Sequence, residues 1–434
     1  MNNINTYTFN NLKNQTKKNK VIFLSCLGAA LEYYDFIIYG MMAIYLSEIF
    51  FPTSTVEMAY LKTFSILSIG YIARPIGGYL FGLVADIYGR KKTLLIVMLV
   101  MAISTMMIGL LPTYETVGLL SSILLIIARI LQGLSFGAEM PSMATIIKEN
   151  TKTGSSGKYF GIMMSSTAVG TLLASFIVAI ITDQYLHDEI IAWVWRLPFL
   201  LGGTLALLVF IMRTRIVETP DFLKGQQSAI LHGSAKQLTI ALFKHRWKDL
   251  LYGMSSTLFF SYLIIFSLYL PFYLKQYFNY TTKAIFSWMT FSILLTVFWS
   301  PLFGHLFDRI NRAKALKIVT FSFLLFLAVS LKLLKLNTPF ALAFFLLGYQ
   351  LFIAIYATNN FVVLSTLFPL NMRATGIGIC YNTAYSLASL TPLLLTPLIN
   401  EINYGFTVMI FSTIVVALTV IGCSFQHSKI PIKP

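Results

Sequence analysis

Two carboxylates lie near the middle of an apolar stretch that is long enough to cross a bilayer. Glu32 and Asp35 are three residues apart within the run from about Val21 to Phe50, and this spacing places both on one face of a helix. A carboxylate at bilayer depth is costly unless it faces the protein interior and has a partner. Buried carboxylates of this kind can bind and release a proton. Because they need a protein environment, the rest of the chain is expected to supply a cavity and partners for them.

Five ionisable side chains lie well inside the apolar runs, all in the first half of the chain: Glu32, Asp35, Arg74, Arg129 and Glu139. At about 1.5 Å of rise per residue, matching depths pair Asp35 with Arg129. The same matching pairs Glu32 with Arg74, and the swapped pairing stays open. Three acids against two bases leave one net negative charge, which a single bound proton would neutralise.

This set of charges suggests a proton carrier. We predict that Asp35 is the main carrier, that Glu32 is the second, and that Arg129 sets the proton affinity, because carboxylate protonation responds to desolvation and to nearby cations. The alternative is that these residues form structural pairs that lock the helices of one half together. Glu139 is compatible both with an inner gate and with a contact between helices.

The composition is that of a membrane protein. Of the 434 residues, 57% are hydrophobic and only 11% are charged, whereas a soluble domain carries about 25% charged residues. Each crossing takes roughly 20 residues, so the chain has room for about twelve spans. The three cysteines, Cys26, Cys380 and Cys423, fall in or at the ends of apolar runs, so neither a disulfide nor a metal site is expected.

The apolar runs predict where the spans lie. Their expected ranges are about 21–50, 58–84, 93–111, 118–147, 159–182, 196–213, 248–275, 282–306, 316–335, 339–367, 374–400 and 405–423. Lys and Arg gather on one side of this arrangement by roughly four to one, which by the positive-inside rule places both termini in the cytoplasm. The formal charge of +16 is thus a topology signal, and nucleic-acid binding is not expected. The first run is too long for a signal peptide and is interpreted as an uncleaved span.

The chain divides into two halves that repeat. The expected parts are a tail at 1–20, a six-helix bundle at 21–213, a polar linker at 214–247, a second six-helix bundle at 248–423 and a tail at 424–434. The segments Gly82–Arg90 and Gly304–Arg312 both read Gly, three residues, Asp, two residues, a turn residue and Arg. Parallel halves related by an axis along the membrane normal suit alternating access.

At these residues the sequence resembles the major facilitator superfamily, whose signature loops join helices two and three, and eight and nine. Within it, the chain is similar to the metabolite:proton symporter family, which includes proline/betaine, α-ketoglutarate, citrate and shikimate permeases. The matching stretches are Leu31–Phe36 with Tyr39–Gly40, Arg74–Gly78, Pro112–Gly118, Gln132–Gly133 with Gly137–Glu139, Trp195–Phe199, Glu218–Phe222, and Arg373–Gly376 with Tyr381–Asn382. The resemblance implies an all-α membrane protein with the twelve-helix major facilitator fold, in two pseudo-symmetric six-helix halves.

The repeated loops carry the candidate gating residues. The set is Asp86, Arg90, Lys91, Asp308, Arg309 and Arg312. Charge pairs at these cytoplasmic helix ends can hold an inner gate closed. Their repetition in both halves favours gating over a simple cluster of charges at the membrane edge.

The candidate substrate contacts are polar and aromatic side chains, mostly in the second half. They are Tyr39, Tyr262, Tyr269, Tyr349, Gln350, Tyr356, Asn359, Asn360, Tyr381 and Asn382. Helices one, four, seven and ten line the cavity in the superfamily, so the resemblance favours the residues of helices seven and ten. Packing is the alternative for any single tyrosine. Arginines that face three acids, together with aromatic rings that can hold an ammonium group, suit a zwitterion or monocarboxylate better than a di- or tricarboxylate.

These features predict a proton-coupled symporter, not an enzyme, that imports a small polar metabolite such as proline, betaine or an organic acid. The proton is the coupling ion, and no cofactor is expected. The expected location is the bacterial cytoplasmic (inner) membrane, as a monomer. Proton-antiport efflux of a siderophore or drug-like compound and uniport are the alternatives, although the segment Gly161–Ala174 lacks the proline of an antiporter signature. A membrane-embedded enzyme or sensor is disfavoured, because no His, Cys and Asp cluster has the spacing of metal ligands.

Overall fold

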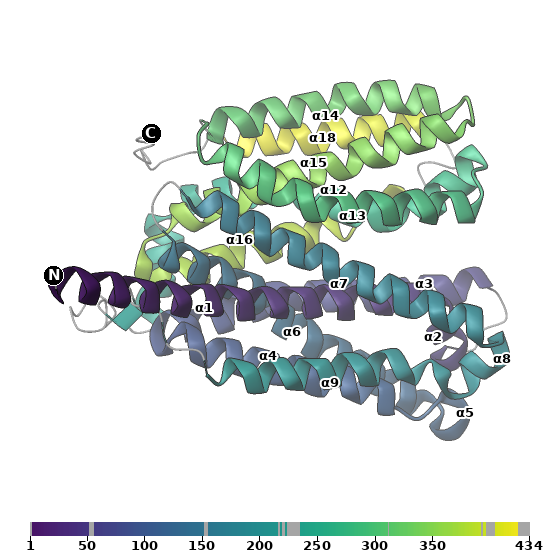
Figure 1. Ribbon diagram of the computed structural model, residues 1–434. Coiled ribbons are helices and arrows are strands. Elements are labelled where there is room, and N and C mark those ends of the chain that lie inside the picture. The colour runs from purple at the N-terminus through teal and green to yellow at the C-terminus, as the bar shows by residue number, and fades with distance from the viewer. Residues whose placement is uncertain are drawn as a thin grey trace.

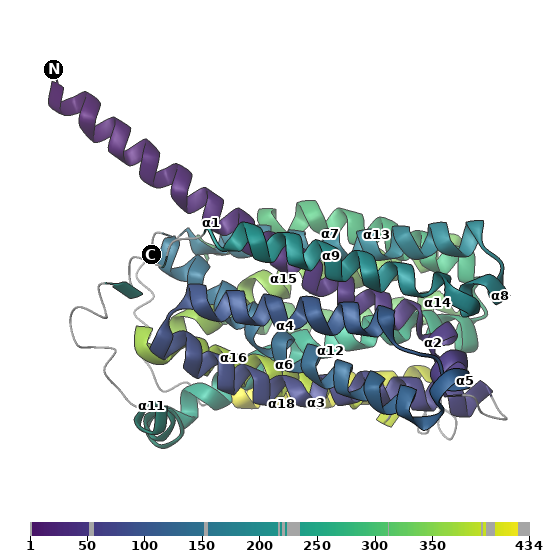
Figure 2. The same ribbon diagram turned by 90° about the horizontal axis from the view of Figure 1, so that it is seen from below.

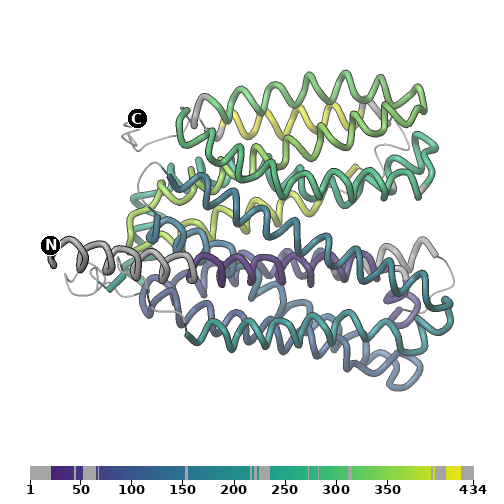
Figure 3. Tube along the Cα trace, in the orientation of Figure 1, coloured from purple at the N-terminus to yellow at the C-terminus, as the bar shows by residue number. Residues whose placement is uncertain are grey.

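The fold is described from a computed structural model of the chain. Its description covers residues 2–51, 56–151, 155–215, 235–310, 312–391 and 404–423, together with residues 218, 222–223 and 394–395 (Figure 3). Side chains are described for most of these residues, the exceptions being 2–20, 44, 56–64, 67, 272, 282, 312–314, 404–406 and 422–423. Residues 216–217, 219–221 and 224–234 of the predicted linker and the whole predicted C-terminal tail lie outside the described residues.

The first half is a bundle of long helices. They are α1 (Asn2–Met41), α3 (Val56–Tyr88), α4 (Arg90–Leu110), α6 (Leu119–Asn150), α7 (Ser156–Gln184) and α9 (Arg196–Arg213), with the shorter α2 (Ala43–Phe50), α5 (Tyr114–Val117), α8 (His187–Glu189) and η1 (Ile190–Val194) between them. The N-terminal part of α1 projects from one end of the bundle, which we call the tail end (Figure 2).

The second half repeats this arrangement and lies beside the first (Figure 1). Its helices are α11 (Ala235–Ile240), η2 (Ala241–His245), α12 (Trp247–Phe278), α13 (Thr282–Phe307), α14 (Arg312–Leu334), α15 (Pro339–Leu367), η3 (Leu370–Met372), α16 (Arg373–Ala388) and α18 (Tyr404–Cys423). The two halves meet along two pairs of helices, α7 with α13 and α3 with α16. The pocket, the Glu32–Arg74 pair and the tail-end contacts described below lie in or beside this interface.

Most predicted spans agree with the observed helices. Within the described residues, nine helices are long and apolar enough to cross a membrane. The spans at 196–213 and 339–367 coincide with α9 and α15. The chain is therefore a multi-pass membrane protein with the predicted all-α fold.

The first predicted span differs from the structure in two ways. It is not one helix, because the chain bends at Met42 between α1 and α2, next to Gly40, which adds backbone freedom. The predicted N-terminal tail is also helical, since α1 begins at Asn2. No Gly or Pro precedes Gly28 in the sequence, so no residue stops the helix from continuing toward the N-terminus.

Glycines allow the helices that carry the buried charges to touch. A Cβ added to Gly133 would collide with the carbonyl oxygen of Gly70, and one added to Gly137 would collide with that of Arg74. The spacing of four between Gly133 and Gly137 thus brings α6 against α3, as small residues do in membrane helices. The close approach places Arg74 between α1 and α6.

Adding one methyl group tests this packing. We expect Gly137→Ala to destabilise the protein by about 1–3 kcal/mol, because overpacking forces backbone shifts. Gly40→Ala is the matched control, since its Cβ would meet nothing within 4 Å. The measurement is the thermal unfolding midpoint in detergent. Equal midpoints for the two variants would contradict the packing argument.

Candidate functional site

Glu32 and Arg74 form an ion pair at the boundary between the halves. Arg74 Nη2 on α3 lies 3.6 Å from Glu32 Oε1 on α1, and both side chains are buried. The guanidinium also lies against the rings of Tyr381 and Tyr385 on α16, with Cζ 5.8 and 4.9 Å from the ring centres. The pairing of Glu32 with Arg74 predicted from depth is confirmed, and α16 of the other half covers it.

Asp35 lies deeper inside the first half and forms no ion pair with an arginine among the described residues. Thr105 Oγ1 on α4 donates a hydrogen bond to Asp35 Oδ2 at 2.7 Å, and Gln132 Nε2 on α6 donates to Thr105 Oγ1 at 2.8 Å. Arg129 Nη1 then donates to Gln132 Oε1 at 2.8 Å. The predicted direct pair of Asp35 and Arg129 is wrong: two neutral side chains link them. The spacing of Gln132 one turn after Arg129 explains this link, because the two lie on one face of α6.

The environment of Arg129 is aromatic rather than acidic. Its Cζ lies 3.8 Å from the centre of the Tyr39 ring on α1. This cation–π contact stabilises a buried guanidinium. Tyr39, predicted as a substrate contact, is fully buried beside Arg129.

A third buried pair changes the charge count. Arg213, assigned from the sequence to a cytoplasmic loop, ends α9 with a fully buried side chain. Its Nη2 donates to Glu139 Oε1 at 2.6 Å, and its Nε donates to the Leu24 carbonyl at 3.2 Å. The predicted excess of one acid is therefore wrong. Away from the tail end, three buried acids face three buried bases, because Arg213 lies inside the bundle against Glu139.

The Glu139–Arg213 pair is expected to stabilise the first half. Glu139→Gln leaves a buried guanidinium without its counter-ion, so we expect a loss of about 3–5 kcal/mol in unfolding free energy. The double variant Glu139→Gln/Arg213→Met removes both charges and should recover part of that loss. Glu48→Gln is the control, because the Glu48–His187 pair is half exposed and such pairs contribute about 0–1 kcal/mol. Thermal midpoints that fall equally in the single and double variants would contradict the assignment.

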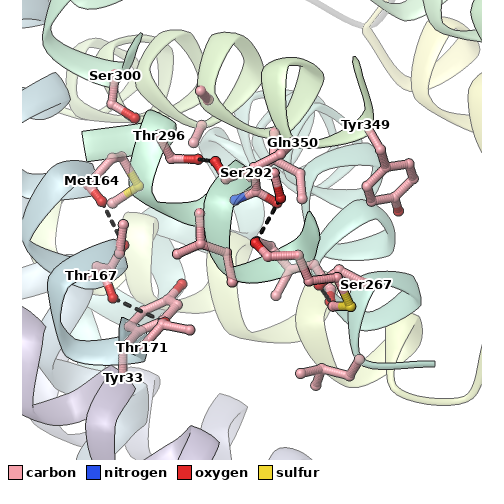
Figure 4. A pocket seen from close by; sticks show the side chains of 18 of the residues that line it. Tyr33, Met164, Thr167, Thr171, Ser267, Ser292, Thr296, Ser300, Tyr349 and Gln350 are labelled. Atoms are coloured by element: carbon pink, nitrogen blue, oxygen red, sulfur yellow. Dashed lines mark hydrogen bonds between the residues drawn. The ribbon is translucent and has the colours of Figure 1, made fainter. Parts of the chain in front are cut away.

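A pocket lies between the halves and is lined by α1, α7, α12, α13 and α15 (Figure 4). Its polar lining residues include Tyr33, Thr167, Thr171, Ser267, Ser292, Thr296, Ser300, Tyr349 and Gln350. The described lining contains no Asp, Glu, Lys or Arg. Several of the hydroxyls donate to carbonyl oxygens of their own helix, as Thr171 does to Thr167 and Thr296 to Ser292. Their oxygen lone pairs are left to accept hydrogen bonds, so the pocket suits a solute that carries donors.

The structure brings two of the predicted substrate contacts to this pocket, Tyr349 and Gln350. Tyr349 also donates to the Leu263 carbonyl at 2.8 Å. The lining does not include the other predicted contacts of the second half, namely Tyr262, Tyr269, Tyr356, Asn359, Asn360, Tyr381 and Asn382.

These other residues have contacts within the second half or across the interface. Tyr262 bonds to Ser412 at 2.6 Å, and Asn360 Nδ2 donates to Thr257 at 3.3 Å. Asn382 Nδ2 donates to the Gly137 carbonyl at 2.7 Å across the interface. The amide N–H groups of Asn360 and Asn382 bond to oxygens of neighbouring helices, whereas Asn382 Oδ1 has no hydrogen-bond partner among the described residues. The sequence alone does not distinguish an amide that bonds to a neighbouring helix from one that bonds to a ligand, because either partner can satisfy the same polar atoms.

At the tail end, Asp86 joins the two halves. Its carboxylate accepts from the Thr375 backbone N–H at 2.9 Å, from the Thr375 hydroxyl at 2.7 Å and from the Ala374 N–H at 3.2 Å. These donors begin α16, and the first N–H groups of a helix favour an anion. Arg90 lies 3.5 Å from Asp86 and donates to the Leu370 carbonyl at 2.9 Å. The first repeated loop therefore ties the first half to α16.

The second repeated loop makes the same contact in the opposite direction. Asp308 accepts from the backbone N–H groups of Gly157 at 2.8 Å and Lys158 at 3.2 Å, which begin α7. Arg309 contacts His305 at 3.1 Å. The backbone N–H of Lys91 donates to Glu218 at 3.1 Å, and the Arg312 side chain lies outside the described residues. Both halves are thus joined at the tail end by an aspartate on a helix N-terminus.

Sequence reasoning missed a further acid at this end. Glu149 Oε1 lies 3.1 Å from Arg90 and 3.6 Å from Arg373. It lies just after the predicted span at 118–147, and the sequence analysis does not single it out. Only the folding of α16 against α6 buries it.

Removing the Asp86 carboxylate is expected to open the tail end. Asp86→Ala loses hydrogen bonds to a charged group, worth about 1.5–3 kcal/mol each. Spin labels on Tyr88→Cys and Lys317→Cys, both exposed, should then report longer distances across the interface. The background would carry Cys423→Ser, since Cys26 and Cys380 are buried. Asp183→Ala, an exposed acid, is the control, and an unchanged distance distribution in Asp86→Ala would contradict a gating role.

Comparisons with known proteins agree with this geometry. Residues 25–392 match the family model described as Major Facilitator Superfamily. A Staphylococcus haemolyticus protein named "Putative proline/betaine transporter" is 32% identical over 403 residues, covering 90% of this chain and 82% of the relative. The Escherichia coli alpha-ketoglutarate permease is 29% identical, covering 82% of each chain. The Salmonella typhi citrate-proton symporter is 27% identical, covering 86% of each.

Solved structures share the fold. A proton:xylose symporter bound to 6-bromo-6-deoxy-D-glucose has a TM-score of 0.76 at 16% identity, covering 96% of this chain and 97% of that chain. The inward-open conformation of the Escherichia coli xylose transporter has a TM-score of 0.67 at 19% identity, covering 95% and 97%.

Proposed function

The chain belongs to the Major Facilitator Superfamily, and from that premise we propose that it is a proton-coupled symporter that imports a small polar metabolite by alternating access. As a member it is a multi-pass membrane transporter of small solutes. The single observation that carries the finer proposal is the position of Asp35. This carboxylate is buried in the half that holds the other buried acid–base pairs, and its nearest arginine reaches it only through Gln132 and Thr105.

The net charge of the six buried side chains indicates how binding of a proton would affect the solute. With three acids against three bases, the buried set is neutral when no proton is bound. One added proton gives it a net positive charge, which would draw a solute that carries a carboxylate into the space between the halves. Oδ1 of Asp35 has no hydrogen-bond partner among the described residues, so it has room for the proton.

The pocket supports a small solute with hydrogen-bond donors. Its hydroxyl oxygens and Gln350 offer acceptors, and charged side chains are absent from its described lining. A di- or tricarboxylate would need several cations there. A zwitterion such as proline, whose ammonium group carries N–H donors, fits this lining better. Betaine has no N–H donor and would meet the oxygens through its cationic nitrogen, and a monocarboxylate needs fewer cations than a di- or tricarboxylate.

The proposal includes an orientation. The tail end collects the basic residues of the sequence, so by the positive-inside rule it faces the cytoplasm of a bacterial cell. The contacts of Asp86 and Asp308 then close the cytoplasmic gate, and solute would enter from the outside.

We expect Asp35→Asn to abolish uphill uptake while it preserves exchange. Wild-type protein in proteoliposomes should accumulate proline or glycine betaine about tenfold per pH unit of inward proton gradient, for one proton per solute. The variant should only equilibrate the solute, yet still exchange labelled for unlabelled solute. The measurement is uptake of both labelled solutes, with Asp183→Asn as the exposed-acid control.

Three outcomes separate the alternatives. Undiminished gradient-driven accumulation by Asp35→Asn would remove Asp35 from the proposal. Downhill uptake by wild-type protein that ignores the gradient would indicate a uniporter. Extrusion of a test compound against the same gradient would indicate antiport efflux.

A further inference from the structure

A cluster of buried polar groups spans the boundary between the halves next to the pocket. Arg74 and Tyr71 come from α3, Glu32 from α1, and Tyr381 and Tyr385 from α16. All five side chains are buried, with exposed fractions of 5% or less. Arg74 Cζ lies 5.4 Å from the centre of the Tyr71 ring and 4.9 Å from that of Tyr385, so the guanidinium lies among tyrosines from both halves.

The cluster is short of hydrogen bonds. Among the described residues, Glu32 Oε2, Arg74 Nε and the Tyr71 hydroxyl have no hydrogen-bond partner. The hydroxyls of Tyr381 and Tyr385 lie near one another and near that of Tyr33, and neither has a hydrogen-bond partner of good geometry among the described residues. The Glu32–Arg74 contact is itself long for a hydrogen-bonded pair, at 3.6 Å. Buried polar groups are normally satisfied, so this many open positions in one place point to a missing ligand.

The open positions are mainly donors. Arg74 offers guanidinium N–H groups, and three tyrosines offer phenol O–H groups, around a single competing carboxylate. Such an arrangement of donors can bind the carboxylate group of a ligand. Tyr33 connects the cluster to the pocket, because it lines the pocket and its hydroxyl approaches those of Tyr381 and Tyr385.

We propose that Arg74, with Tyr71, Tyr381 and Tyr385, is a carboxylate subsite that protonation of Glu32 makes available to the solute. In the unprotonated state Glu32 holds Arg74. A proton on Glu32 removes the competing charge, and Arg74 pairs with the carboxylate of the solute instead. The inference rests on the proposed symport and deepens it: the solute carries one carboxylate for this subsite and a donor-bearing or cationic remainder for the pocket.

Other charged and titratable groups also face Glu32. Asp35 lies one turn along α1, Glu139 on α6 and Arg213 on α9. Glu139 and Arg213 pair with each other. Asp35 accepts a hydrogen bond from Thr105. The tyrosines of α3 and α16 stay neutral across the physiological pH range, because phenols ordinarily titrate near pH 10. Glu32 is therefore the group whose protonation would switch Arg74.

The test is binding of paired probes to the purified full chain in detergent. Glycine betaine carries the carboxylate, and choline has a hydroxymethyl group in its place. Proline and pyrrolidine form a second pair. We expect wild-type protein to bind at least one carboxylate probe about tenfold or more tighter than its partner, which is the worth of one charge-assisted contact. Binding should be tighter at acidic than at alkaline pH.

Variants separate the subsite from a structural role. Glu32→Gln should bind the carboxylate probe tightly at both pH values, because its neutral side chain mimics protonated Glu32. Arg74→Gln should lose about tenfold or more in affinity at both. Tyr385→Phe removes only a hydroxyl and keeps the ring beside Arg74, so it should fold normally and still bind several-fold more weakly.

Results that would overturn the subsite are specific. They are equal binding of betaine and choline and of proline and pyrrolidine, no binding of any probe to wild-type protein, or unchanged affinity in both Arg74→Gln and Tyr385→Phe. If uptake is driven by the gradient but binding does not depend on Arg74, this inference would be wrong and the symport proposal would stand. If binding still depends on pH and on Arg74 but uptake does not depend on the proton gradient, the symport proposal would be wrong and the subsite would stand.

Discussion

The cost of charge in a low-dielectric interior governs the first half of this protein. Away from the tail end, six ionisable side chains are buried between its helices, and an uncompensated charge on any of them would be costly. Each acid has a basic partner: Glu32 and Arg74 form a loose pair, and Glu139 and Arg213 form a tight pair. Two neutral side chains separate Asp35 from Arg129. Glycines that let α3 and α6 touch bring the partners within reach. The differences among the three pairs are what give them different roles.

The tight pair and the loose pair make the contrast clear. Glu139 and Arg213 are 2.6 Å apart, with further bonds from Arg213 to the backbone of α1, so this pair holds three helices together. Glu32 and Arg74 are 3.6 Å apart at the boundary between the halves. A pair that contacts the moving interface can exchange partners when the halves separate, whereas one buried inside a single half cannot. For this reason the proposed proton and solute sites are placed at the boundary and at Asp35, and the Glu139 pair is assigned a structural role.

The contacts at the tail end repeat because the halves repeat. Asp86 caps α16 and Asp308 caps α7, so each half supplies one acid and one helix N-terminus. The pocket between the halves has a neutral, hydroxyl-bearing lining in its described residues, whereas the three buried acid–base pairs lie in the first half. In the proposed symporter, the pocket lining could therefore vary without a change in the residues proposed to couple the proton.

The sequence by itself determined the class, most of the spans, the two halves and the repeated aspartates, and it favoured the Glu32–Arg74 pair over the swapped one, because each follows from local hydropathy, spacing or depth along a helix. It did not determine the burial of Arg213, the Thr105–Gln132 link to Asp35, or which tyrosines face Arg74. It also assigned Tyr262, Asn360 and Asn382 to solute, whereas they bond to other helices. Depth along a helix can be counted from the chain, but the rotation of each helix and the choice of its neighbours are set only when the bundle packs. Packing of the helices therefore decides which groups become partners of the buried polar side chains, and with them the composition of the site.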